Sequence, residues 1–154
     1  MTSHRSYVRA LLLATLLGLT ACGPDIPPDT FPGQPVTQRR DIFKQMLRAF
    51  EPMGLMVRGK ASYSAEKFAA HAAELARLSE LPWAHFPTGS LYPPSKAKPV
   101  VWDKADEFAK AQKQYLAAVG ALNNAAKAQP AQPPVAIYEQ VLESCSSCHK
   151  AFRN

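Results

Sequence analysis

The sequence predicts an all-α protein, folded as one antiparallel four-helix bundle. Four segments carry apolar side chains at steps of three and four residues, which is the spacing of one face of an α-helix. Gly59 follows the first segment, prolines follow the second and the third, and most connections are short, which favours antiparallel neighbours. No segment alternates polar and apolar residues as a half-buried strand does. The 154 residues suffice for one domain with a hydrophobic core.

The first helix is predicted over residues 38–58, and Gly59 suits the position just after a helix end. The second helix begins after Ser64, a favoured N-cap residue, and its buried stripe runs from Phe68 to Ser79. The stripe of the first helix consists of Phe43, Met46, Leu47, Phe50, Met53 and Val57.

A long loop is predicted over residues 81–101, because prolines recur throughout it. A loop of this length in a compact domain usually has a function or packs as a unit. The third helix is predicted over residues 103–127 and the fourth from residue 135 to the end. One face of the fourth helix carries Tyr138, Val141, Leu142, Cys145, Cys148, His149 and Phe152.

The first 21 residues are typical of a secretory signal peptide. Arg5 and Arg9 precede an apolar core over residues 10–19, which is too short to span a bilayer. The core ends in Leu-Thr-Ala-Cys22, which resembles a bacterial lipobox. That resemblance implies cleavage before Cys22 and lipid on its sulfur. A plain signal peptide is the alternative.

Residues 22–36 comprise the lipidated Cys22 and a proline-rich stretch that is predicted to form an extended tether. The domain itself is then expected over residues 37–154. We expect a bacterial protein that faces the periplasm and touches the outer membrane through its lipid anchor only. Gly23 takes the place where an aspartate would suggest retention in the inner membrane.

The charge of the chain gives no sign of nucleic-acid binding. The formal net charge is +6, and it falls to +4 once Arg5 and Arg9 leave with the signal peptide. No basic run with interleaved aromatic residues follows.

The C-terminal helix contains the motif Cys145-Ser-Ser-Cys148-His149, the attachment pattern of a c-type haem. Residues three apart on a helix point the same way, so both sulfurs reach the two vinyl groups on one porphyrin edge. The following residue, His149, is then placed to bind the iron. The motif predicts one covalent haem c near the C-terminus.

Two other interpretations of the cysteine pair are weaker. A thioredoxin-like pair belongs at the start of a helix in an α/β fold, whereas this pair lies near the end of the last helix. A zinc site needs further ligands, and His71 and His85 show no ligand-pair spacing with the motif. We expect both histidines to be ordinary surface or hydrogen-bonded residues.

A motif in the last of four helices, together with further landmarks, resembles the cytochrome c' family and its low-spin relatives of the c-556 type. The resemblance covers about residues 39–154. The landmarks are Arg39, Arg58-Gly59, Tyr63, the run from Leu81 to Phe86, Lys98-Pro99 before Trp102, and the run from Cys145 to Arg153.

The resemblance implies roles for four basic residues. Arg39 and its neighbour Arg40 would pair with haem propionates, although many relatives carry glutamine at the second place. Lys98 would contact a propionate too, and a plain solvated lysine is the alternative there. Arg153, one turn after His149, would lie beside the proximal face and disfavour protonation of the imidazole.

The position four residues after Arg39 faces the distal side of the iron in the family. Low-spin relatives carry a methionine ligand there, whereas this chain carries Phe43, which has no lone pair to give. We therefore expect five-coordinate, high-spin iron bound by His149 alone. Met46, a further turn along, is the candidate for a sixth ligand in the alternative low-spin arrangement.

These residues favour a protein that binds nitric oxide, and carbon monoxide more weakly, over other classes. An apolar distal pocket suits these gases better than dioxygen, which gains from a hydrogen-bond donor. The alternative is a low-spin electron-transfer cytochrome with an unidentified redox partner. We expect no enzyme activity. Peroxidase chemistry requires a distal acid–base group, and the first helix offers only Phe43, Met46 and Leu47 on that face. A homodimer formed through the first two helices is compatible with the apolar Leu55, Met56 and Phe68.

Overall fold

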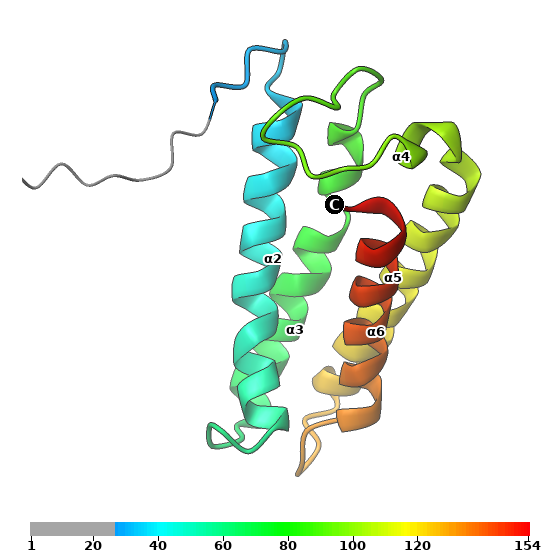
Figure 1. Cartoon of the computed structure of the whole chain (residues 1–154). Coiled ribbons are helices and arrows are strands. Elements are labelled where there is room, and N and C mark those ends of the chain that lie inside the picture. Colours follow the sequence, from blue (N-terminus) through cyan, green and yellow to red (C-terminus); the bar gives the residue numbers. More distant parts are fainter. Residues whose placement is uncertain (1–26) are drawn as a thin grey trace, which may run out of the picture.

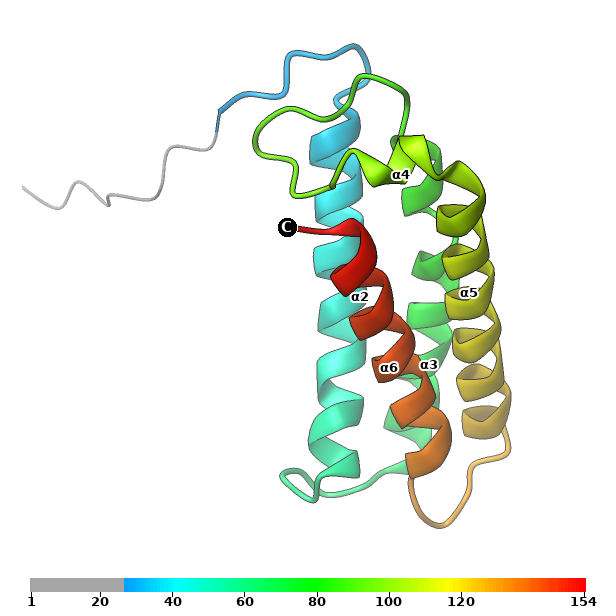
Figure 2. The ribbon, with the colours of Figure 1, turned by 45° about the vertical axis from the view of Figure 1, so that its right-hand side comes forward.

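The computed structural model describes residues 27–154 and shows the expected bundle (Figures 1 and 2). Its long helices are α2 (Pro35–Val57), α3 (Ala65–Ser79), α5 (Ala105–Lys127) and α6 (Val135–Phe152). Helix α2 packs on α3, α3 on α5 and α5 on α6, whereas α2 and α6 hardly touch. The all-α prediction is confirmed, and the four long helices lie close to their predicted ranges.

Helix α2 begins at Pro35 rather than at residue 38, inside the range assigned to the tether. Proline suits the first turn of a helix, where no N–H is needed. Just before it, Asp29 is buried and Phe31 stacks on Tyr92. The last part of the predicted tether therefore packs as part of the domain. The predicted signal peptide and Cys22 lie outside the described residues.

The loop predicted over residues 81–101 contains two short helical turns. The 3-10 helix η1 (Pro82–His85) begins with a proline, and α4 (Val100–Asp103) follows Pro99. Between them, residues 86–99, here called the site loop, cross over one end of the bundle near the C-terminus (Figure 1). The prolines that exclude a long helix are compatible with single turns of this kind.

The core is the shared interior of the four long helices, and the predicted stripes supply most of it. Three stripe residues are exposed instead, namely Leu47 at 53%, Leu142 at 41%, and His149. Met56 and Phe68 are buried, so they offer no surface to a second copy, and only Leu55 of that predicted set is exposed. Within residues 27–154, none of the helices combines the length and apolarity that crossing a membrane requires.

Gly54 in α2 is expected to be essential for close packing. A Cβ atom at this position would clash with the hydroxyl of Tyr138, which is 2% exposed and stacks on Phe50. We expect Gly54→Ala to lower the free energy of unfolding by about 1–3 kcal/mol, as overpacking does. Urea denaturation of the holoprotein measures this, with Gly120→Ala as control because a Cβ there meets nothing. Equal stability of the two variants would contradict the clash.

Candidate functional site

Cys145 and Cys148 lie one turn apart on α6 and point into the bundle. Cys145 packs against the main core, and Cys148 packs against a second cluster formed by Val101, Phe108 and Phe152. Burial, and next the neighbouring Cys148, raise the pKa of Cys145 to about 11. A thiol with a raised pKa is a poor nucleophile at neutral pH. This environment disfavours the thioredoxin-like interpretation and leaves two side-by-side sulfurs facing apolar surroundings.

His149 is largely exposed at the last turn of α6, next to Arg153. Partial burial lowers the pKa of its imidazole, and the positive charge of Arg153 lowers it further. Arg153 itself is tied back to this turn, since its backbone N–H donates to the carbonyl of His149 at 3.0 Å. The pair therefore keeps the imidazole neutral, which is the form that binds a metal.

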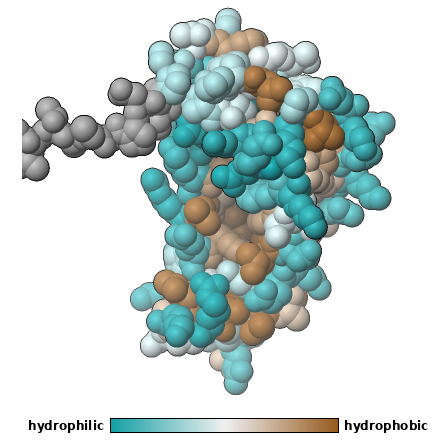
Figure 3. Space-filling view, viewed as in Figure 1, coloured by the Kyte–Doolittle hydropathy of each residue, from teal (hydrophilic) through white to brown (hydrophobic). Residues whose placement is uncertain are grey.

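The face between α2 and α6 is hollowed, with apolar atoms on its floor below the hydrophilic atoms of the site loop (Figure 3). Phe43 of α2 packs edge-on against Trp83 and Phe86, with ring centroids 6.0 and 6.5 Å apart. Both of these rings also contact Phe108, and Cys148 packs on the same cluster. Aromatic rings from α2, η1 and α5 thus face the cysteines of α6.

The sequence analysis did not predict an unpaired polar atom among these aromatic rings. The indole Nε1 of Trp83 is buried and has no hydrogen-bond partner among the described residues. The other indole, Trp102, donates to the carbonyl of Phe86 at 3.1 Å. Packing alone therefore holds the Trp83 ring.

Arg39 is only 3% exposed and holds the site loop against α2. Its guanidinium donates to four oxygens at 2.7–2.8 Å, which are the carbonyls of His85 and Ser90 and the hydroxyls of Ser90 and Ser95. It also lies over the ring of Phe86, 4.6 Å from the centroid. Burial lowers the pKa of Arg39, although arginine stays charged throughout the physiological range. Four of its five donors are engaged, one by η1 and three by the site loop.

Asp29 is a buried carboxylate that acts electrostatically on this cation, and the sequence analysis did not single it out. Its carboxylate accepts a hydrogen bond from the Thr37 backbone N–H at 2.8 Å and another from the Tyr92 hydroxyl. Burial opposes its ionisation, but these hydrogen bonds prevail and lower the pKa of Asp29. Asp29 and Arg39 attract each other electrostatically. The segment before α2 is thereby fixed to the site loop.

We expect the stability of the protein to depend on the charge of Asp29. A carboxyl whose pKa is lowered in the folded state stabilises the fold above its unfolded pKa, about 3.9, and loses that contribution as the pH falls through the folded value. Asp29→Asn should therefore reduce the loss of unfolding free energy between pH 7 and pH 3, measured by urea denaturation. Asp41→Asn, at an exposed position of α2, is the control. An equal pH dependence in both variants would contradict this role.

The end of the site loop is joined to the C-terminus. The Lys98 backbone N–H donates to the Phe152 carbonyl at 2.9 Å, and the Lys98 ammonium donates to the Lys150 carbonyl at 2.8 Å. Ala97 and Arg153 form an isolated β-bridge. A cation at the last turn of a helix is attracted by the negative end of the helix dipole and stabilises the helix. Lys98 thus caps the helix that carries the cysteine motif, instead of standing free in solvent.

The other side chains considered as ligands lie in ordinary surroundings. Met46 is 7% exposed and belongs to the main core. His71 is half-buried on α3, and the carbonyl of His85 accepts a bond from Arg39. Residues 27–154 contain no group of three or more histidine, cysteine or acidic side chains that would hold a metal ion. The zinc interpretation therefore finds no support in this part of the chain.

The comparisons with known proteins agree on one family. The family model described as Cytochrome C' matches residues 34–153. The chain belongs to the cytochrome c' family. A cytochrome c' from Alcaligenes xylosoxydans xylosoxydans is 32% identical over 122 residues, which cover 79% of this chain and 94% of the relative.

Solved structures of cytochrome c' confirm the fold. A nitric oxide complex of a mutant from Alcaligenes xylosoxidans matches with a TM-score of 0.74 and 32% identity, covering 80% of this chain and 95% of that one. A carbon monoxide-bound variant of the same protein matches with a TM-score of 0.75 and 31% identity, covering 82% and 99%.

Cytochromes c' carry haem c bound covalently through cysteines, and this chain does the same. The residues of the structure fit such a group. Two sulfurs project from one side of α6, a neutral imidazole follows, and the hollow beside them has an apolar floor. The sparse contact between α2 and α6 leaves room between these helices for a flat, largely apolar group.

Proposed function

We propose that this cytochrome c' is a periplasm-facing haem protein whose five-coordinate, high-spin iron binds nitric oxide and, more weakly, carbon monoxide. The observation that carries the proposal is the place of Phe43. Its ring, on α2, packs against Trp83 and Phe86, and these two rings pack on the same cluster as Cys148. A phenyl ring offers iron no ligand atom, and its bulk restricts access to small molecules.

The chain's own residues would hold and tune the haem as follows. Cys145 and Cys148 would form the two thioethers, and His149 would be the only axial ligand from the protein. The iron supplies the site at which a diatomic gas binds. Burial and, after it, the positive charge of Arg153 lower the pKa of His149, and both would favour the neutral imidazole.

Three further basic residues would bind the haem propionates. They differ in how many of their hydrogen-bond donors are already engaged within the protein. Arg39 has four donors engaged by η1 and the site loop, so it would act mainly by its positive charge and its remaining N–H. Arg40 is half-exposed on α2, next to Arg39. Lys98 gives one of its three ammonium donors to the end of α6, which leaves two.

The optical spectrum of the purified holoprotein tests this proposal. We expect a broad high-spin spectrum in the ferrous state, which changes when nitric oxide is added. Sharp low-spin bands would instead indicate a sixth protein ligand. Met46→Leu identifies its source, because that variant should turn high-spin if Met46 is the ligand and should leave the spectrum unchanged if Met46 only packs in the core.

The low-spin alternative, an electron-transfer cytochrome of the c-556 type, is less well supported. It needs the Met46 sulfur at the iron, whereas Met46 packs in the main core at 7% exposure. A high-spin gas-binding protein is still able to exchange electrons with a redox partner, and we propose no enzyme activity. Lipidation at Cys22, anchoring to the outer membrane and a homodimer are further proposals that rest on the sequence.

A further inference from the structure

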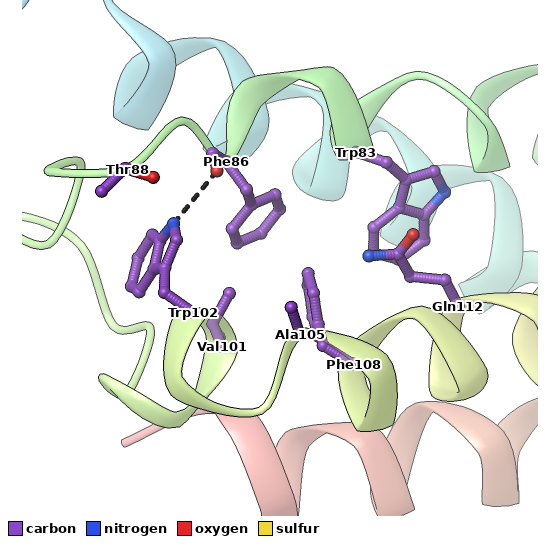
Figure 4. Close-up of a pocket in the computed structure, with 8 residues that line it drawn as sticks. All are labelled: Trp83, Phe86, Thr88, Val101, Trp102, Ala105, Phe108 and Gln112. Atoms are coloured by element: carbon purple, nitrogen blue, oxygen red, sulfur yellow. Dashed lines mark hydrogen bonds between the residues drawn. The ribbon is translucent and has the colours of Figure 1, made fainter.

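A cavity lies beside Trp83, Phe86 and Phe108, here called the aromatic wall. The first two of these rings hold Phe43. The cavity has a volume of about 340 Å³, and it opens between η1, the site loop, α4 and the start of α5. Figure 4 shows Trp102 on one side and Phe108 on the other, with Phe86 between them. Val101 and Ala105 line it as well, and its polar lining consists of Thr88 and Gln112, with no charged side chain.

The cavity and the ring of Phe43 share aromatic neighbours. Trp83, Phe86 and Phe108 line the cavity, and Phe43 contacts the first two of these rings. These two rings therefore contact both the cavity and Phe43. Phe108 meets Trp83 and Phe86 edge-on, at centroid distances of 6.1 and 5.2 Å, whereas Trp83 and Phe86 stack on each other at 6.4 Å.

The rings of the wall differ in how firmly they are fixed. The guanidinium of Arg39 covers Phe86, and the indole of Trp102 in α4 donates to the backbone carbonyl of Phe86. The Trp83 ring has no hydrogen bond to break, since its Nε1 has no partner among the described residues. A movement of Trp83 therefore costs packing only, and it is the ring best able to open the wall.

We propose that this cavity is a docking site for small uncharged gases and the entry through which they reach Phe43, a proposal that rests on the gas-binding function above. A haem attached to α6 would occupy the hollow between α6 and α2, so that a gas approaching Phe43 needs another way in. Six of the eight lining residues are aromatic or aliphatic, and such side chains favour nonpolar molecules, as xenon and benzene binding to apolar cavities show. Nitric oxide and carbon monoxide are of this class.

Xenon, carbon monoxide and a cavity-filling variant test the proposal. Crystals of the holoprotein pressurised with xenon should show an atom between Trp102 and Phe108, and Ala105→Trp should remove it. In flash photolysis, Ala105→Trp should slow carbon monoxide association about tenfold, within the range seen among variants of one site. Ala117→Trp, at an exposed alanine of α5 that does not line the cavity, should change neither result.

The outcomes separate the two parts of the proposal from each other and from the proposed function. No xenon in the wild-type cavity overturns the docking site. Xenon in the cavity together with an unchanged association rate in Ala105→Trp overturns the entry route. Xenon occupancy is decided even if the iron proves to be low-spin and binds no gas. Thr88→Trp fills the same cavity from the site loop and replaces Ala105→Trp should that variant fail to fold.

Discussion

Phe43→Ala is expected to speed the association of carbon monoxide with the ferrous protein by about ten- to a hundredfold. A gas that binds the iron on the α2 side must push the Phe43 ring against Trp83 and Phe86. Displacing a packed phenyl ring costs about 1.5–3 kcal/mol, and this cost enters the barrier to binding. Alanine removes the ring and hence the cost. Stopped-flow mixing with carbon monoxide measures the rate directly.

Phe50→Ala is the matched control for this prediction. Phe50 lies two turns further along α2, is half-buried like Phe43, and stacks on Tyr138 at a centroid distance of 4.5 Å. Its removal loosens the core without touching the wall, so the association rate should stay near that of the wild type. An unchanged rate in Phe43→Ala, or an equal rise in both variants, would overturn the gating role of Phe43.

The regular part of the fold was predictable because it depends on local patterns. The stripe from Phe68 to Ser79 reports a helix face directly, and the side chain of Ser64 caps that helix as expected. The cysteine motif was equally clear, because its spacing is a property of one helix. The family comparisons support the haem that it predicts.

The network around the site loop was not predictable, because its partners are far apart in the sequence. Arg39 was expected to meet propionates, yet its donors reach Ser90 and Ser95, more than fifty residues away. Nothing in the pattern around Asp29 indicates a buried carboxylate, since it stands in a proline-rich stretch typical of an extended tether. The partner of Asp29, Tyr92, lies in a loop without periodicity. Only the tertiary fold brings these residues together.

The second large effect is expected at this network, where Arg39→Leu should lower the free energy of unfolding by about 3 kcal/mol or more. The substitution leaves the buried Ser90 carbonyl and hydroxyl without their donor, and it leaves Asp29 without its nearby cation. Removing one member of a buried, hydrogen-bonded charge network typically costs this much. Urea denaturation of the holoprotein measures the loss.

The hydrogen bonds from Arg39 that hold the site loop are here called the clamp. Two controls separate the loss of this clamp from a general effect of losing charge on α2. Arg48→Leu, at an exposed position of the same helix, should change stability by less than about 0.5 kcal/mol. Arg39→Lys keeps the charge, but its single nitrogen does not span oxygens on His85, Ser90 and Ser95, so it should recover only part of the loss. Full recovery by lysine would mean that charge alone matters at residue 39. In that case, attraction to the propionates and to Asp29, rather than the clamp on the site loop, would explain the need for a buried cation.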